Sequence, residues 1–257
     1  MEKVIGIAGY GKVGGSMALA LYRRGWEVHI LTRFPDDAPF HFHPRDRAEQ
    51  FIERARNFII AVRDSDLRYM AHRLSHHRVV GKRFLHLSGA LTSSELKPLK
   101  EKGAHTGSLH PLQSFPRKDP SLLENIYFSF EGDEEARALA LKLAEEFRSR
   151  LFPIDPKKKT LYHAAAVFAS NFADAMWIIA DIIMREISDV GIEAMEPLIR
   201  STLANALEMG PRKALTGPAR RGDFITIEKH LKALQKYPEI REIYEKITNF
   251  ILQEGKG

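Results

Sequence analysis

Three side chains able to do chemistry recur on one face of a predicted helix that runs from about residue 156 to 188. At about 100° per residue, Lys159, His163 and Ser170 fall within an arc of about 40°. Asn171 borders that arc, beside the apolar stripe of the same helix. An ammonium, an imidazole and a hydroxyl can bind a small carbonyl compound and supply the proton that its reduction requires. The pattern predicts an acid–base site.

Two of these residues are alternative proton donors. A lysine in the first turn of a helix opposes the helix macrodipole, so Lys159 suits that position if the site lowers its pKa. The same field favours a neutral His163, which is a weaker acid but a good hydrogen-bond donor. We expect one of the two to donate the proton, with Asn171 and Ser88 orienting the substrate. Each residue also has a structural alternative. Lys159 could be a solvated surface charge, and His163 could be a histidine packed in the core.

A glycine-rich loop near the N-terminus predicts a site for a dinucleotide. The loop follows a strand-like segment and opens a helix, and it reads Gly9-Tyr10-Gly11-Lys12-Val13-Gly14. In the GxGxxG pattern the first glycine permits a tight turn, the second lets the backbone approach a pyrophosphate, and the third lets the helix pack closely on the sheet. The six residues are therefore expected to bind a cofactor at the helix N-terminus.

The end of the second predicted strand favours NADP(H) over NAD. Thr32 and Arg33 stand where an NAD site usually carries an acidic residue for the ribose hydroxyls. A guanidinium and a hydroxyl bind a 2′-phosphate, which a carboxylate repels. Asp36 and Asp37 lie slightly downstream and are the alternative, as ribose ligands of NAD. Val62, at the end of the third predicted strand, is expected to border the cofactor.

Alternating strand and helix patterns place these residues in one fold. Short β-branched or apolar runs at 3–8, 27–32, 58–62, 84–87, 106–109, 126–130 and 151–154 alternate with helical periods. This alternation predicts an α/β domain at residues 1–154, a Rossmann-type doubly wound sheet with mostly parallel strands. Only helical patterns follow, so residues 155–257 are predicted to form an all-α domain. Asp155 and Pro156 are expected to begin its first helix.

Three further residues are expected to contact the substrate. Ligands of such sheets bind at the carboxyl ends of the strands, where His110 lies. Ser170 shares the helix face of His163. Arg221 lies in a connection rich in Gly, Pro and Arg, where it can clamp a substrate carboxylate; a surface charge is the alternative. Asp223 is expected to cap the next helix.

Composition narrows the classes of function. The chain has no cysteine, which excludes thiolate metal sites, disulfides and a cysteine nucleophile. His41 and His43 could share a metal, but no carboxylate or third histidine stands at a telling spacing, so no metal is expected. The net charge of +6 is explained by a small polyanionic ligand, and nucleic acid is not an expected partner. The chain has no run of about 18 uncharged apolar residues, which a membrane-spanning helix would need, and no secretory pattern. It is therefore predicted to be a cytoplasmic protein without a membrane partner.

Five ordered blocks carry a resemblance to a known family. They read GYGKVGG, HLSGA, GSLHPLQSF, YHAAAVFASNF and ALTGPARRGDFITIEKH. The chain resembles bacterial proteins that pair a Rossmann-like domain with a helical C-terminal domain of unknown function, number 2520. That family is similar to the 6-phosphogluconate dehydrogenase-like superfamily, which includes ketopantoate and pyrroline-5-carboxylate reductases.

The resemblance implies an NADP-dependent oxidoreductase that forms a homodimer through its helical domain and reduces a small carbonyl or imine substrate. A 2-oxo acid such as ketopantoate is the foremost expected substrate. In the superfamily, a lysine followed four residues later by asparagine often opens the interdomain helix. Lys159 matches this pattern, whereas His163 replaces the asparagine. The alternative is a non-catalytic NADP(H) sensor, which has no need of a proton donor.

Overall fold

The computed structural model describes residues 3–254, and the chain divides by its contacts into compact units at residues 1–170 and 171–257. The boundary predicted after residue 154 falls earlier, at the point where strands give way to helices. The two divisions differ because the next helix begins with Lys159, whose side chain is buried against strands of the sheet. By its packing, that helix belongs to the unit that contains the sheet.

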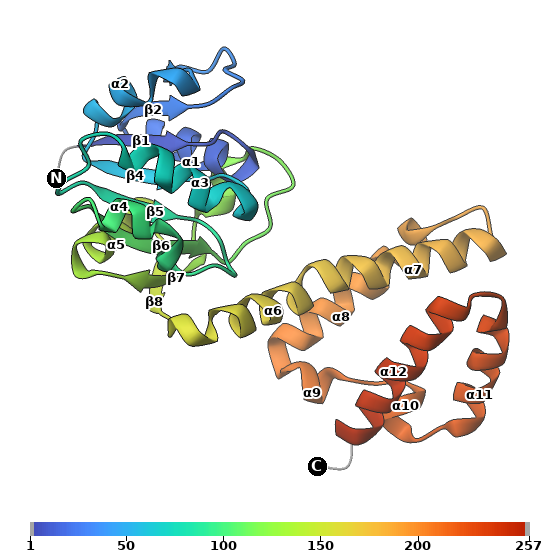
Figure 1. The fold of residues 1–257 in the computed structure, drawn as a ribbon. Coiled ribbons are helices and arrows are strands. Elements are labelled where there is room, and N and C mark those ends of the chain that lie inside the picture. The colour runs from blue at the N-terminus through green and yellow to red at the C-terminus, as the bar shows by residue number, and fades with distance from the viewer. Residues whose placement is uncertain (1–2, 255–257) are drawn as a thin grey trace. The chain divides into compact units, whose positions relative to one another are not determined.

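An eight-stranded sheet forms the centre of the first unit, in the order β3-β2-β1-β4-β5-β6-β7-β8 (Figure 1). Its strands are β1 (Val4–Ala8), β2 (Glu27–Leu31), β3 (His41–His43), β4 (Asn57–Ile60), β5 (Arg83–His86), β6 (His105–Pro111), β7 (Tyr127–Gly132) and β8 (Arg150–Pro153). Neighbouring strands are parallel, except that β6 and β7 are antiparallel. The predicted α/β class with a mostly parallel, Rossmann-type sheet is confirmed.

Helices cover both faces of this sheet. They are α1 (Lys12–Tyr22), α2 (Ala48–Glu53), α3 (Asp64–Ser75), α4 (Lys97–Lys100) and α5 (Glu134–Glu146). Buried side chains of α1 and α5 form one apolar cluster with Ile59 of β4, while those of α2, α3 and α4 form a second cluster with Phe58 and Ile60 of the same strand. Successive side chains of a strand point to opposite faces, so β4 contributes to both layers of the core.

Short 3₁₀ segments join several of these elements. They are η1 (Arg45–Arg47), η2 (Ser93–Leu96), η3 (Pro120–Leu123), η4 (Pro156–Lys158), η5 (Ile192–Met195) and η6 (Leu234–Lys236). The predicted cap at Asp155 is confirmed, since its carboxylate accepts a hydrogen bond of 2.9 Å from the backbone N–H of Lys157. The Asp223 carboxylate likewise accepts one of 3.1 Å from the backbone N–H of Thr226, which confirms the second predicted cap.

The single long helix predicted from 156 to 188 is wrong. The chain forms α6 (Lys159–Ala169) and α7 (Asn171–Ile187), separated at Ser170, whose φ of −128° and ψ of −82° are not helical. The hydroxyl of Ser170 donates to the carbonyl of Ala166 at 2.7 Å, a contact that bends helices. Within residues 171–254 every regular element is helical: α7, α8 (Glu196–Met209), α9 (Pro211–Ala214), α10 (Pro218–Arg221), α11 (Phe224–Ala233) and α12 (Pro238–Glu254).

The apolar stripe along α6 and α7 is exposed in the single chain. Phe168 is 69% exposed, Phe172 47% and Ile182 46%. Periodicity identifies an apolar face but does not say which surface covers it. The segment Pro156–Ile187 is also long and apolar enough to cross a membrane, a criterion that core helices of soluble proteins meet as well. The sequence prediction required a wholly uncharged run and therefore did not select it.

Candidate active site

The glycine loop between β1 and α1 has the geometry of a phosphate-binding turn. Gly9 has a φ of +106°, and a Cβ there would lie 2.3 Å from the carbonyl oxygen of Ala61. A Cβ at Gly14 would lie 2.3 Å from the carbonyl oxygen of Gly9, so that glycine lets α1 pack against the loop. A Cβ at Gly11 would meet no atom within 4 Å. The second glycine is thus not required by packing and leaves space at the helix N-terminus.

Tyr10 of the loop lies beneath a lysine from a distant segment. The Nζ of Lys118 lies 3.5 Å from the centroid of the Tyr10 ring and 3.1 Å from the carboxylate of Asp36. Burial, together with the neighbouring Asp36, raises the pKa of Tyr10 to about 12. Because Asp36 is engaged by Lys118, it is a poor candidate for a ribose ligand. In the same loop Lys12 is exposed and Val13 is half-buried.

The end of β2 lies beside this loop, as predicted. The backbone N–H of Gly9 donates to the carbonyl of Leu31 at 3.0 Å. Thr32 is buried, and its hydroxyl accepts a hydrogen bond of 3.2 Å from the backbone N–H of Phe34. Arg33 is exposed, with its guanidinium carbon 5.5 Å from the centroid of the Phe34 ring. Its guanidinium nitrogens thus remain available to an anion.

Val62 also borders the loop. Its Cγ1 lies 3.2 Å from the position that a Cβ at Gly9 would occupy. Strand β1 lies between β2 and β4, so the chain order of the strands reverses beside β1. Dinucleotides bind at the carboxyl ends of the strands at such a switch point. The loop, Arg33 and Val62 all lie at that edge.

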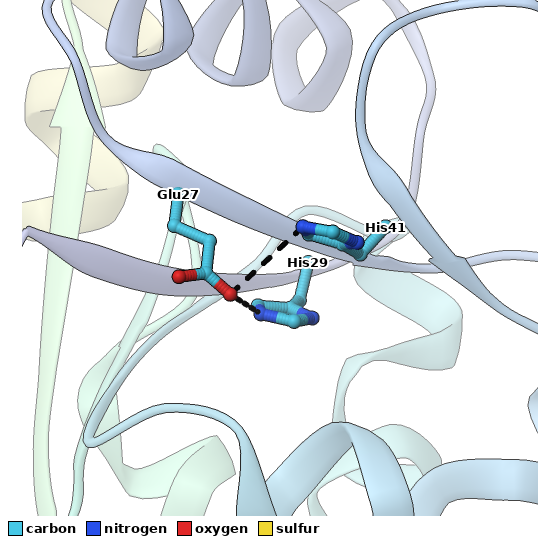
Figure 2. Close-up of side chains that lie close together, drawn as sticks. All are labelled: Glu27, His29 and His41. Atoms are coloured by element: carbon cyan, nitrogen blue, oxygen red, sulfur yellow. Dashed lines mark hydrogen bonds and ion pairs between the residues drawn. The ribbon is translucent and has the colours of Figure 1, made fainter.

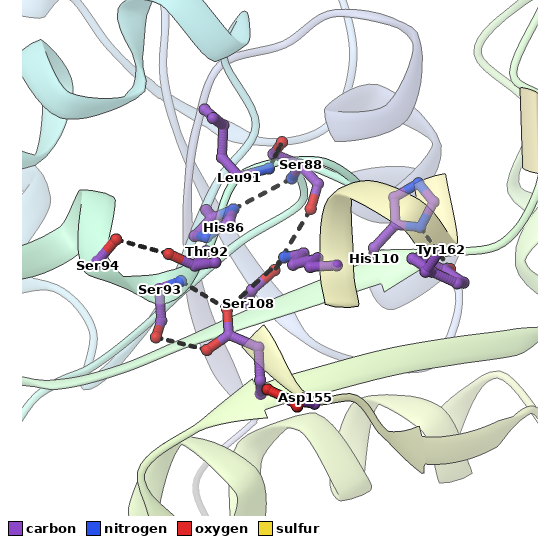
Figure 3. Close-up of polar contacts among 12 residues, drawn as sticks. His86, Ser88, Leu91, Thr92, Ser93, Ser94, Ser108, His110, Asp155 and Tyr162 are labelled. Carbon is purple, nitrogen blue, oxygen red and sulfur yellow. Dashed lines mark hydrogen bonds and ion pairs between the residues drawn. The ribbon is translucent and has the colours of Figure 1, made fainter. Parts of the chain in front are cut away.

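The imidazole of His110 lies at the same edge of the sheet, beside Tyr162 (Figure 3). His110 of β6 and His163 of α6 have ring centroids 5.7 Å apart, with their planes nearly perpendicular. The Nδ1 of His110 forms a hydrogen bond of 2.8 Å with the hydroxyl of Tyr162. Burial, followed by the neighbouring His163 and Lys159, lowers the pKa of His110 to about 4. His110 is therefore a neutral, oriented side chain at physiological pH.

His163 is held against the backbone after β5. A Cβ at Gly89 would lie 2.5 Å from Nδ1 of His163 and 2.8 Å from Nε2 of His110. Nδ1 of His163 is buried and has no hydrogen-bond partner among residues 3–254. A buried polar atom without a partner costs about 1–3 kcal/mol, and few such atoms occur in a folded protein. The site thus brings together His110 and His163, two of the residues predicted from the sequence.

Lys159 is buried rather than solvated. Its side chain is 1% exposed, its Nζ donates to the hydroxyl of Ser108, and the Nζ lies 3.7 Å from the carboxylate of Glu131. Burial lowers the pKa of Lys159 to about 8, against the opposing effect of Glu131. Burial and the charge of Lys159 also lower the pKa of His86 to about 3. The ammonium of Lys159 is therefore enclosed at the edge of the sheet, between α6 and the strands β6 and β7.

The other predicted site residues are distributed differently. The hydroxyl of Ser88 donates to the carboxylate of Asp64 at 2.9 Å and accepts from the backbone N–H of Leu91 at 3.0 Å, so it stabilises the turn after β5. Ser170 lies at the helix break described above. Asn171 and Arg221 belong to the second unit, at the start of α7 and the end of α10. Their predicted roles stay predictions.

Sequence reasoning missed three contributors to this site. Glu131 accepts hydrogen bonds from the backbone N–H of Ser93 at 2.6 Å and from its hydroxyl at 2.7 Å, and it faces Lys159. Its one signal is that it is the single charged residue of strand β7. Tyr162 precedes His163 and gave no separate signal. Gly89 is recognisable only once both imidazoles are seen against it.

Comparison with known families agrees with this geometry. A family model described as a Rossmann-like domain matches residues 2–111, and one described as a domain of unknown function, DUF2520, matches residues 126–251. The chain is a Rossmann-like protein with a DUF2520 domain. Its resemblance to that family, first seen in five sequence blocks, is confirmed. No curated protein matches the sequence of this Rossmann–DUF2520 chain.

Several solved structures share the fold over almost the whole chain. A candidate NADP oxidoreductase from Bacteroides fragilis is 25% identical, with 98% of each chain covered and a TM-score of 0.82. A protein from Thermotoga maritima is 26% identical, with 98% of each chain covered and a TM-score of 0.72. A reductive aminase from Aspergillus terreus, in complex with NADPH, is 14% identical, with 100% of this chain and 96% of that one covered and a TM-score of 0.76. At that identity the likeness is one of fold.

Proposed function

We propose that the chain is an NADP(H)-dependent oxidoreductase that transfers hydride between nicotinamide and a small carbonyl or imine substrate. A 2-oxo acid of the ketopantoate type is the first candidate. One observation carries the proposal: the open glycine loop and the imidazole pair of His110 and His163 lie on the same carboxyl edge of one sheet. The similarity to a candidate NADP oxidoreductase supports the same class.

The residues at this edge fit a dinucleotide phosphate. Gly11 leaves room for the pyrophosphate, the N-terminus of α1 offers backbone N–H groups, and the exposed guanidinium of Arg33 suits a 2′-phosphate. Strand β6 is the third neighbour of β1, and strands lie about 4.8 Å apart, so His110 lies about 14 Å across the edge from the loop. The loop and Arg33 would hold the dinucleotide, and His110 and His163 would then be the side chains toward its reactive end.

The bound cofactor supplies the hydride, and the chain supplies the proton. His163 is the preferred donor, because Lys159 is enclosed by Ser108 and Glu131, whereas the imidazole of His163 has an unpartnered Nδ1 among the described residues. Its ring N–H donates to the carbonyl oxygen as charge develops there. His110, oriented by Tyr162, adds a second hydrogen bond. Lys159, whose charge also acts on His110, is a fixed positive charge that favours the anionic oxygen.

The helical unit fits the interface of a cytoplasmic homodimer. Among residues 171–254 Ile227 is the one buried large apolar side chain, whereas fifteen others are exposed, among them Phe172, Ile178, Ile182, Leu198, Leu207 and Phe224. Exposed apolar surface of this extent marks an interaction site. We assign its cover to a second copy of the chain, and light scattering on the purified protein should give twice 29.2 kDa.

Two measurements test the proposed activity. Fluorescence titration should show NADPH binding more tightly than NADH, and Arg33→Gln should reduce that preference at least tenfold, since a 2′-phosphate loses its fork of donors. A spectrophotometric screen of NADPH oxidation against 2-oxo acids, cyclic imines and aldehydes, led by ketopantoate, should find a substrate. His163→Gln should then lower kcat about 100-fold while leaving NADPH affinity unchanged.

The alternative is a non-catalytic NADP(H) sensor. It predicts binding of NADPH without turnover of any compound in the panel, and no effect of His163→Gln beyond stability. Failure to bind either reduced coenzyme would contradict both readings.

A further inference from the structure

Three potential metal ligands converge at the outer edge of the sheet, on β2 and β3 (Figure 2). The carboxylate of Glu27 lies 2.8 Å from Nε2 of His29 and 3.9 Å from Nε2 of His41. One ligand atom from each of the three residues lies within 4.8 Å of the other two. Ligand atoms around a tetrahedral zinc ion are about 3.3 Å apart, so small side-chain rotations suffice to bind one ion.

Strand geometry fixes this arrangement. Glu27 and His29 are two residues apart on β2 and therefore point to the same face of the sheet. His41 of β3 is the register partner of His29, and their rings stack with centroids 4.8 Å apart. The sequence offered only His43 as a partner for His41, because Glu27 and His29 come from the preceding strand, which pairing alone brings alongside.

A fourth residue orients the central imidazole. The side chain of His29 is 4% exposed, and its second nitrogen, Nδ1, lies 3.0 Å from Nε2 of His43. In metal sites a ligating histidine almost always donates its other ring N–H to such a partner, which fixes the tautomer. His29 can thus present a lone pair at Nε2 while Nδ1–H donates to His43.

The surroundings leave room for an ion and further ligands. The cluster lines an open pocket of about 580 Å³, which also includes Arg47 and Arg54. The carboxylate of Glu27 offsets part of the charge of the ion, and water or a small anion near the arginines can complete its coordination.

We propose that Glu27, His29 and His41 form a binding site for a divalent transition-metal ion of the zinc class. Imidazole and carboxylate ligands suit Zn²⁺, Ni²⁺ and Cu²⁺ better than Mg²⁺ or Ca²⁺. The ion joins β2 to β3, a strand of three residues at the edge of the sheet. Binding there stabilises the segment between the two strands, since the backbone N–H of Thr32 donates to the carbonyl of His43 at 3.1 Å.

Calorimetric titration of the full chain with ZnCl₂ tests the site, using protein without a polyhistidine tag that has been freed of metal by a chelator. One equivalent should bind, and the melting temperature should rise by roughly 5–10 °C when free Zn²⁺ exceeds Kd a hundredfold. His41→Ala and Glu27→Gln should each weaken binding at least tenfold. The side chain of His41 is 65% exposed, so its removal leaves the fold intact.

His72→Ala is the matched control. His72 and His76 lie one turn apart on α3 with ring centroids 4.7 Å apart, a surface pair that can itself attract zinc weakly. This variant should keep the single tight equivalent. The proposal is overturned if the wild-type chain binds no Zn²⁺ at roughly 100 µM, if His41→Ala and Glu27→Gln bind as the wild type does, or if His72→Ala abolishes binding. None of these outcomes depends on NADPH or on reductase activity.

Discussion

The ammonium of Lys159 lies 3.7 Å from the carboxylate of Glu131, and both side chains are almost completely buried. Ser93 and Ser108 supply the remaining hydrogen bonds to this pair. The pair joins the first turn of α6 to β7. A buried ion pair contributes little net stability compared with apolar residues, but it costs much when one partner is lost. Lys159 lies one helical turn before His163 on α6, which supports an electrostatic role of the pair in the proposed site.

Removing one member of this pair should destabilise the protein strongly. Glu131→Leu leaves the Lys159 ammonium buried without a countercharge, and we expect the free energy of unfolding at pH 7 to fall by about 3–5 kcal/mol. The double variant Lys159→Met/Glu131→Leu should recover most of that loss. Urea denaturation of the wild type, both single variants and the double variant gives the coupling. Simply additive single effects would contradict a direct interaction.

The same lysine should give the stability a characteristic pH dependence. The pKa of Lys159 is about 8 in the folded chain, against an ordinary value of 10.5. Between these two values the unfolded chain binds more protons, so stability rises with pH. Relative to the double variant, the wild type should therefore gain on the order of 3 kcal/mol from below pH 8 to above pH 10.5. Parallel curves for the two proteins would refute the lowered pKa.

Periodicity and turn chemistry were sufficient to predict the sheet, but not every element. Seven strands were predicted because each is a run of apolar residues between helical patterns. Strand β3 was not, because three residues with two histidines carry no strand signal and depend on pairing with β2. The break at Ser170 was missed because its hydroxyl competes with the backbone, an effect that hydrophobic periodicity does not report.

For the site, the sequence predicted positions better than environments. His110 and His163 were expected at one edge because strand ends and helix starts meet there, and the structure places them together. Lys159 can be buried because the carboxylate of Glu131 faces its ammonium. The antiparallel pairing of β6 and β7 brings Glu131 to that position. Such a contact between distant segments leaves no local pattern.

Gly11 and Gly14 should respond differently to substitution, although both belong to one motif. A Cβ at Gly11 meets nothing, so Gly11→Ala should leave the melting temperature unchanged while reducing NADPH affinity about 100-fold, because the methyl group occupies the pyrophosphate space. A Cβ at Gly14 would lie 2.3 Å from a carbonyl oxygen, so Gly14→Ala should lower the stability by about 1–3 kcal/mol. Thermal denaturation and fluorescence titration separate the two effects. Equal melting temperatures for both variants would contradict this assignment.

Gly89 should control the position of the imidazole pair. A Cβ there would lie 2.5 Å from Nδ1 of His163, so Gly89→Ala must displace that ring or the helix that carries it. A displacement of about 1 Å can cost roughly 100-fold in rate, and we expect kcat to fall by 10- to 100-fold with NADPH affinity unchanged. Steady-state kinetics and fluorescence titration provide the two measurements.

A double-mutant cycle identifies the cause of that loss. If Gly89→Ala acts by displacing His163, it should have little further effect on kcat in a His163→Ala background, where the clash with the ring is absent. An equal loss in both backgrounds would mean that Gly89 acts through His110, whose Nε2 lies 2.8 Å from the same Cβ position. His110→Ala in place of His163→Ala would then remove the effect, and His110 rather than His163 would be the residue that contacts the substrate oxygen.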